Sequence, residues 1–111
     1  MDAVARLRYL RVSPQKARLV ADTIRGKRVE EALDLLRYNP KAVARDLRKL
    51  VESALANAKN AEAGVDVDRL VVADIHVDGG PSLKRIRYRA MGRVFRILKR
   101  TCHVTVQLEA R

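Results

Sequence analysis

Apolar positions recur every three or four residues in three segments of the chain, and each repeat predicts an amphipathic helix. The first helix is expected to begin at Pro14, after the capping residue Ser13, and to stop at a left-handed Gly26. A second, shorter helix follows, and a third is expected to begin at Asn39-Pro40 and to run to about residue 61. Their buried faces would carry Ala17, Val20, Ala21 and Ile24; Val29, Ala32, Leu33 and Leu36; and Val43, Leu47, Leu50, Val51, Ala54, Leu55 and Ala58.

Three other segments alternate apolar and polar residues, a pattern typical of strands with one buried face. The apolar sides would carry Ala5, Leu7 and Tyr9 in residues 3–10; Val71, Ala73, Ile75 and Val77 in residues 67–78; and Leu98, Cys102, Val104, Val106 and Leu108 in the last segment. Antiparallel pairing of the last two segments, apolar face to apolar face, centres a turn near residues 89–91. The sequence therefore predicts an α+β fold, with three helices packed on one face of a small antiparallel sheet.

The stretch between the last two strands, residues 79–100, carries eight Lys or Arg residues and no Asp or Glu. Basic and apolar residues are interleaved, as in Arg85-Ile86-Arg87, so the stretch is too charged for a core and too apolar for a plain disordered tail. We expect a long protruding basic β-hairpin whose arms each reach about 35 Å at strand rise. The chain would be a single domain, with a globular part of about residues 1–78 and 101–111 and an extended hairpin of about residues 79–100.

Composition points to a polyanionic partner. The formal net charge is +11, and 17 of the 24 basic residues are Arg, whose planar guanidinium pairs with phosphate. Nucleic acid is therefore the leading partner. A second basic set in the first strand and helix suggests contact with several RNA segments at once; it comprises Arg6, Arg8, Arg11, Lys16, Arg18, Arg25, Lys27 and Arg28.

Other chemistries find little support. No segment approaches 18 consecutive apolar residues and no signal peptide opens the chain, which argues against a membrane protein. The lone Cys102 excludes an internal disulfide, and His76 and His103 lack metal-ligand spacing with it, so no metal or other cofactor is expected. A nuclease would need a general acid and base, and the hairpin has no carboxylate, so no enzyme is expected.

Two other nucleic-acid-binding architectures fit parts of the sequence. A helix-turn-helix is disfavoured because the second helix carries Glu30, Glu31 and Asp34, which would repel phosphate. The remaining alternative is an architectural nucleic-acid-binding protein with a basic β-arm, in which Met91 would serve as an apolar wedge at a kinked base step. The chain offers no obvious dimer seam for such a protein.

Short motifs occur along nearly the whole chain in a specific order and spacing. They include Val12-Ser13-Pro14, Ile24-Arg25-Gly26-Lys27, Glu52-Ser53-Ala54, Gly80-Pro81, Gly92-Arg93, Lys99-Arg100-Thr101 and His103-Val104-Thr105-Val106. Taken together, these motifs resemble the family of bacterial large-subunit ribosomal protein twenty-two, the exit-tunnel hairpin protein. The tip departs from the family pattern, because Tyr88 stands where Pro is usual and Met91 where Arg is usual.

The resemblance implies a structural constituent of the large ribosomal subunit that binds and organises its rRNA. The body would lie near the tunnel exit, and the hairpin would line the tunnel, where its tip would affect macrolide sensitivity. The implied partners are 23S-type rRNA, neighbouring large-subunit proteins and the nascent polypeptide, in the cytoplasm, with no membrane and no homo-oligomer.

The basic pattern and the resemblance together give a set of expected contacts. The residues expected to bind rRNA are Arg6, Arg8, Arg11, Lys16, Arg18, Arg25, Lys27, Lys84, Arg85, Arg87, Arg89, Arg93, Arg96, Lys99, Arg100, Thr101 and His103. The tunnel tip would comprise Tyr88, Arg89, Ala90, Met91 and Gly92.

Overall fold

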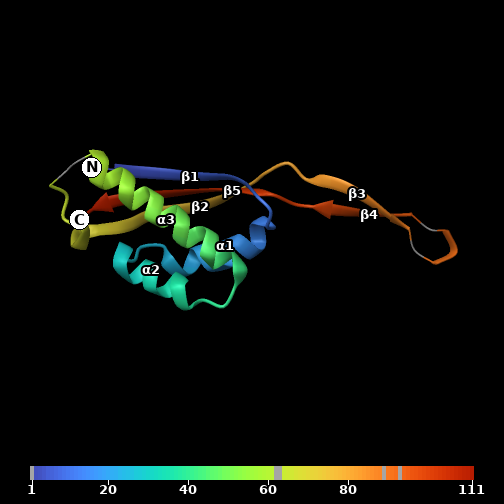
Figure 1. Ribbon diagram of the computed structural model, residues 1–111, viewed down its shortest axis with the longest axis horizontal. Coiled ribbons are helices and arrows are strands. Elements are labelled where there is room, and N and C mark those ends of the chain that lie inside the picture. Colours follow the sequence, from blue (N-terminus) through green and yellow to red (C-terminus); the bar gives the residue numbers. More distant parts are fainter. Residues whose placement is uncertain (1, 62–63, 89, 93) are drawn as a thin grey trace.

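The computed structural model describes residues 2–61, 64–88, 90–92 and 94–111. Three α-helices follow the first strand, and the remaining strands follow the helices (Figure 1). The elements are β1 Asp2–Leu10, α1 Pro14–Ile24, α2 Val29–Tyr38, α3 Ala42–Ala61, β2 Leu70–Gly79, β3 Leu83–Tyr88, β4 Val94–Lys99 and β5 Cys102–Ala110. Two short 3-10 turns, η1 Val67–Arg69 and η2 Ala90–Gly92, complete the description.

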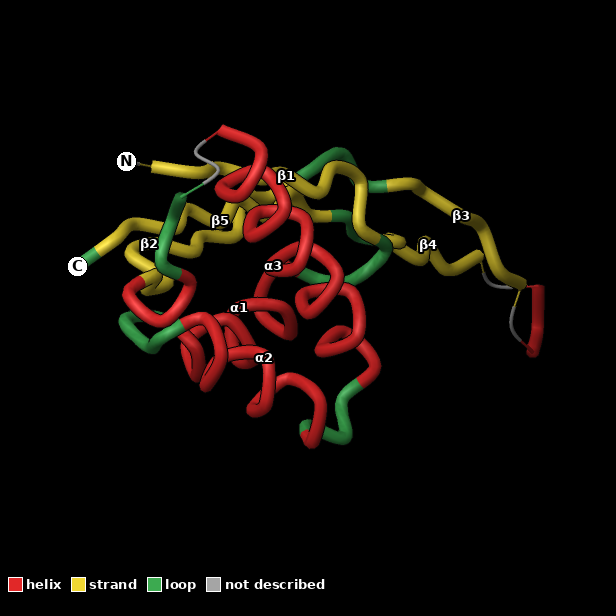
Figure 2. Tube along the Cα trace, turned by 60° about the vertical axis from the view of Figure 1, so that its left-hand side comes forward, coloured by secondary structure: helices red, strands yellow, loops and turns green. Residues whose placement is uncertain are grey.

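The body is built on a three-stranded antiparallel sheet with the order β1-β5-β2. The last strand, β5, is central, so both ends of the chain are held in one sheet. Figures 1 and 2 show the three helices gathered over one face of this sheet. The predicted α+β architecture is confirmed.

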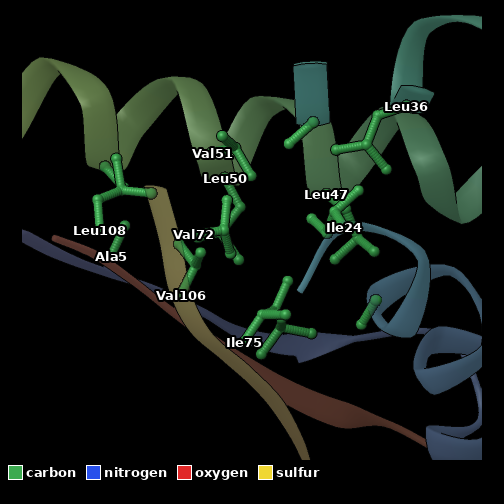
Figure 3. Close-up of a cluster of buried hydrophobic side chains, with 14 of the residues drawn as sticks. Ala5, Ile24, Leu36, Leu47, Leu50, Val51, Val72, Ile75, Val106 and Leu108 are labelled. Carbon is green, nitrogen blue, oxygen red and sulfur yellow. The ribbon is translucent and has the colours of Figure 1, made fainter. Parts of the chain in front are cut away.

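The core lies between the helices and the sheet (Figure 3). Helix α3 contributes Leu47 and Val51, and the central strand contributes Val104, Val106 and Leu108, all fully buried. Burying one such aliphatic side chain stabilises the fold by about 1.5–3 kcal/mol. The predicted buried faces of the three helices are confirmed at all but two positions. Leu33 of α2 and Leu55 of α3 are only partly buried.

The helix ends differ from the prediction in two places. Ser13 occupies the N-cap position of α1, but its side chain makes no capping hydrogen bond. Helix α3 begins at Ala42 rather than at Pro40, because the Asn39 side chain accepts a hydrogen bond from the Lys41 N–H, at 3.0 Å, and forms a turn before the helix. Gly26 has φ of 80°, the left-handed conformation expected of it.

The predicted buried side of the first strand is wrong at Tyr9, whose side chain is 64% exposed. The register with β5 shifts between Leu7 and Leu10, so that Leu10 lies opposite Cys102. Tyr9 has φ of 59°, a left-handed conformation that interrupts the alternation of an extended strand. The irregularity turns the Tyr9 ring away from the helices.

A bulge also corrects the prediction for β2. Val72 is fully buried whereas Val71 is only partly buried, the reverse of the expected phase. The register with β5 shifts between Val72 and Asp74, which moves the alternation by one residue. Ile75 and Val77 then face the core as predicted. The first residues of the predicted strand form η1 instead.

The basic stretch forms an arm that leaves the body as a separate two-stranded sheet of β3 and β4 (Figure 1). Its strand pairing runs from Leu83 opposite Lys99 to Tyr88 opposite Val94, which centres the hairpin on Met91, at the end of the predicted turn range. Met91 has φ of 67° and Gly92 has φ of 72°. The molecule measures 65 × 25 × 16 Å, and its radius of gyration is 17.1 Å. A compact chain of this length would have a radius of about 13 Å.

The expected apolar side of the final strand fails at its arm end. Leu98 belongs to β4 and is 45% exposed, whereas Thr101, expected on the outer side, is 5% exposed. Residues 100–101 separate β4 from β5, so the alternation of one strand does not continue into the other. From Cys102 onward the predicted buried side is confirmed.

Candidate nucleic-acid interface

Most of the predicted cationic contacts lie on the surface. Those with exposed side chains are Arg6, Arg8, Arg11, Lys16, Arg18, Arg25, Lys84, Arg85, Lys99 and Arg100, and Lys27 is partly buried. Arg89 and Arg93 lie outside the described residues, and so do the side chains of Arg87, Tyr88, Ala90 and Arg96. The described cations occupy three regions: β1 with the segment after it, α1 beside the opposite sheet edge formed by β2, and the arm.

Two of these arginines close the outer edge of β2. Arg25 donates from Nε and Nη2 to the carbonyl oxygen of Ile75, at 3.2 and 2.6 Å. Arg18 donates from Nε and Nη2 to the carbonyl oxygen of Val77, at 3.2 and 2.9 Å. An open sheet edge presents unpaired carbonyl groups to other chains, and these guanidinium groups occupy two of them. Arg25 also pairs through Nη1 with Asp22, at 2.7 Å, so all three of its nitrogens are engaged within the protein.

The loop after α1 seals the other half of the same edge. The Gly26 N–H donates to the Val72 carbonyl at 2.9 Å, and the Val72 N–H donates to the Lys27 carbonyl at 2.8 Å. Arg28 and Val71 form an isolated antiparallel bridge beside them. The left-handed backbone of Gly26 lets the chain turn from the helix onto the strand. The motif Arg25-Gly26-Lys27 therefore serves the fold, whatever else its side chains contact.

The neck of the arm is fastened by Thr101. Its hydroxyl donates to the Pro81 carbonyl oxygen at 2.5 Å, and its own carbonyl oxygen accepts from the Gly80 N–H at 3.0 Å. A Cβ atom on Gly80 would lie 2.6 Å from the Thr101 hydroxyl oxygen. Gly80 is thus required because the two segments of the neck approach each other closely. The structure places Thr101 inside the neck, with its hydroxyl bonded to protein.

His103 stands on the strand next to the neck and is tied to β1. Its Nδ1 accepts the backbone N–H of Tyr9 at 3.0 Å, and the two rings meet edge to face with centroids 4.9 Å apart. Because Nδ1 accepts this hydrogen bond, it carries no hydrogen of its own, and the N–H group of the ring is at Nε2. Its side chain is only partly buried. Tyr9 could not be predicted from the sequence as its partner, because only the register irregularity in β1 brings the two rings together.

Exposed carboxylates occur on α2 and on β2. Glu30, Glu31 and Asp34 are exposed on α2. On β2, His76 lies between Asp74 and Asp78, with Nδ1 3.1 Å from one carboxylate and Nε2 3.7 Å from the other. Within the described ranges, no three His, Cys, Asp or Glu side chains are arranged so that they could hold a metal ion. The arm, residues 79–100, carries cations and no carboxylate, so it is the part of the chain that most strongly attracts a polyanion.

The core thiol has no surface role. Cys102 is fully buried on the central strand, and burial raises the pKa of its thiol, an effect that the positive charge of Arg18 partly opposes. A neutral, buried thiol packs as a small apolar side chain. In the described part of the chain, none of the helices combines the length and the apolar character needed to cross a membrane.

One further cation, Lys41, was not among the contacts predicted from the sequence. Lys41, just before α3, lines a groove at the base of the arm together with Arg11, Lys16, Lys99 and Arg100. No linear pattern connects Lys41 with these residues, because they come from four separate parts of the chain. Only the packing of α3 beside α1 and the neck brings Lys41 to this position.

Residues 5–109 match the family described as ribosomal protein L22p/L17e, so the match covers nearly the whole chain, body and arm together. Proteins of this family are part of the cytoplasmic ribosome, where they bind large-subunit rRNA and other ribosomal proteins. The chain therefore belongs to the ribosomal protein L22p/L17e family and is a structural, non-enzymatic constituent of the large ribosomal subunit that binds rRNA.

Proposed function

We propose that the arm is embedded in rRNA and lines the nascent-peptide exit tunnel, with Met91 at its tip facing the nascent chain. The body, about residues 1–78 and 101–111, stays outside near the tunnel exit, as a single copy. The observation that carries this proposal is the arm itself. It is a basic two-stranded ribbon that leaves the body, in a molecule whose longest dimension is 65 Å. Its two strands contact each other far more than they contact the body.

The arrangement of charge along the arm fits insertion into RNA rather than contact along one side. The register sets Lys84 opposite Leu98 and Lys99 opposite Leu83, so a cation in each of these pairs faces an apolar residue. Neighbouring positions of a strand alternate between its two faces, so Lys84 and Arg85 belong to opposite faces. Both are exposed. Cations on both faces are best neutralised by phosphates on both sides.

The described surface cations are proposed to make the remaining rRNA contacts. Arg6, Arg8 and Arg11 extend along and after β1, and Lys99 and Arg100 mark the base of the arm. Arg18 and Arg25 contribute mainly by holding β2, and Thr101 by holding the neck. Folded RNA is recognised through its backbone and shape by such a surface, with few contacts to base edges.

The tip provides the test of the tunnel assignment. The Met91 side chain is 97% exposed, so a photo-crosslinking residue can replace it without disturbing a core. Ribosomes carrying this variant would be stalled with a nascent chain long enough to fill the tunnel. We expect a crosslink from position 91 to the nascent chain, and none from the same residue placed at Leu35 on α2. Assembled ribosomes that give no nascent-chain crosslink from position 91 would overturn the tunnel proposal.

A further inference from the structure

A groove lies where the arm leaves the body, and none of the residues that the structure describes fills it. Its cavity volume is about 720 Å³, which falls within the usual size of small-ligand sites. Four parts of the chain line it: the segment after β1, the first two turns of α1, the start of α3 and the end of β4 with Arg100. The groove thus spans the body and the arm.

The polar lining of the groove is cationic. Among the described residues, five cations and no carboxylate line it: Arg11, Lys16, Lys41, Lys99 and Arg100. Within the described residues, the ion pairs involve other cations of the protein and not these five. Like charges gathered without counter-charges repel one another, and an anion bound among them removes that repulsion. Charge complementarity therefore selects an anionic occupant.

The same groove has apolar walls. Leu19 of α1 is 60% exposed and Leu98 of β4 is 45% exposed, and both line the groove with Val12 and Val43. A phosphodiester backbone alone offers no apolar surface to the exposed leucines, and an apolar peptide offers no negative charge to the five cations. A nucleotide combines what the two kinds of wall require, because its base has an apolar face and its phosphates are anionic.

We propose that this groove holds a single unpaired nucleotide of the rRNA, with its base against Leu19 and Leu98 and its phosphates among the five cations. The inference rests on the rRNA-binding function and adds a base-holding site to an interface otherwise made with the RNA backbone. Because Leu98 belongs to the arm and Leu19 to the body, the bound nucleotide also ties the arm to the body in one orientation.

The test uses the full chain and complete large-subunit rRNA. A double variant, Leu19→Asn with Leu98→Asn, removes the apolar walls and keeps every charge. A matched double variant, Leu35→Asn with Tyr38→Asn, changes two exposed apolar residues of α2 that line a different hollow, beside Glu31 and Asp34. All four side chains are exposed, so both variants are expected to fold, and thermal unfolding verifies this. Binding is measured at several salt concentrations, and unpaired bases are mapped with base-specific chemical probes.

We expect the wild-type protein to protect an unpaired base that the groove variant leaves reactive, while protection elsewhere persists. Affinity should fall about threefold to tenfold through the lost apolar contact, with an unchanged dependence on salt, and the α2 variant should match the wild type. A groove variant that protects the same bases and binds equally well would overturn the nucleotide site alone. A wild-type protein that failed to bind rRNA would overturn the parent function as well, and the two failures are told apart by the wild-type measurement.

Discussion

The hydroxyl of Thr101 bonds to the carbonyl oxygen of Pro81, 2.5 Å away, across the neck where the arm leaves the body. The bond joins the segment that enters the arm, between β2 and β3, to the segment that returns from it, between β4 and β5. Gly80 precedes Pro81, and because it has no Cβ atom, the Thr101 hydroxyl can approach it closely. A two-stranded ribbon is marginally stable by itself in water. The neck therefore supplies the fixed base from which the arm points.

Adding a methyl group at the neck should be costly. In Gly80→Ala, the new Cβ would lie 2.6 Å from the Thr101 hydroxyl oxygen, so the neck must shift. We expect a loss of about 1–3 kcal/mol in the free energy of unfolding, measured by urea denaturation. Gly79→Ala is the matched control, because its Cβ would meet nothing within 4 Å. Equal stabilities of the two variants would show that the neck is not tightly packed.

Removing Arg25 should open the edge of β2. Arg25→Ala leaves the Ile75 carbonyl without its guanidinium donors, which should lower the free energy of unfolding by about 1–2 kcal/mol. The exposed edge should also promote self-association, which light scattering would detect. Arg37→Ala, on the exposed side of α2, serves as the control for loss of one arginine. If both variants behave alike, the edge-sealing role of Arg25 is wrong.

An arm cation should act on RNA affinity and not on stability. Each phosphate contact contributes roughly 0.7–0.9 to the slope of log K against log salt. Arg85 is exposed on β3, away from the core, so Arg85→Ala should reduce the slope by about one contact and leave the unfolding free energy unchanged. The rRNA-binding isotherm at several salt concentrations gives the slope. A slope identical to that of the wild type would mean that Arg85 touches no phosphate.

The buried thiol predicts a pH dependence of stability in the alkaline range. Because burial raises the pKa of Cys102, the folded protein keeps the thiol neutral at pH values where the unfolded chain ionises it. The stabilisation is complete below the pKa of the unfolded thiol, about 8.5, and is lost as pH rises through the folded pKa. The unfolding free energy should therefore fall as pH rises above the pKa of the unfolded thiol, and should fall less in Cys102→Ala. Parallel pH curves for the two proteins would contradict this.

Local periodicity predicted the helices well because each buried face is repeated over several turns. The stripe from Val43 to Ala58 specifies a helix that must cover the sheet, and the structure places it there. The strands were harder, because bulges at Tyr9 and after Val72 depend on the register with β5 and leave no turn residue in the sequence. In those places a single shifted residue reverses the side of the strand that is buried.

The sequence predicted the pattern of cations at the candidate interface, but not which of these side chains also hold the fold together. Arg18 and Arg25 look like surface cations in the sequence, and their bonds to β2 carbonyls follow only from how α1 packs on the sheet. Thr101 was expected to face RNA, but the end of β4 before it places it in the neck. Lys41 was missed for the same reason. Sequence spacing reveals which residues share an element, while the groove joins residues from several elements.

The most direct test of the central claim is retention of the protein on large subunits washed at about 1 M salt, where charges are screened beyond about 3 Å. A protein held only by charges on its outer surface would be released as those contacts weaken. An arm embedded in folded rRNA is held by the surrounding RNA as well, so we predict that the protein stays on the subunits in full amount. Its release into the wash with loosely bound factors would contradict the account.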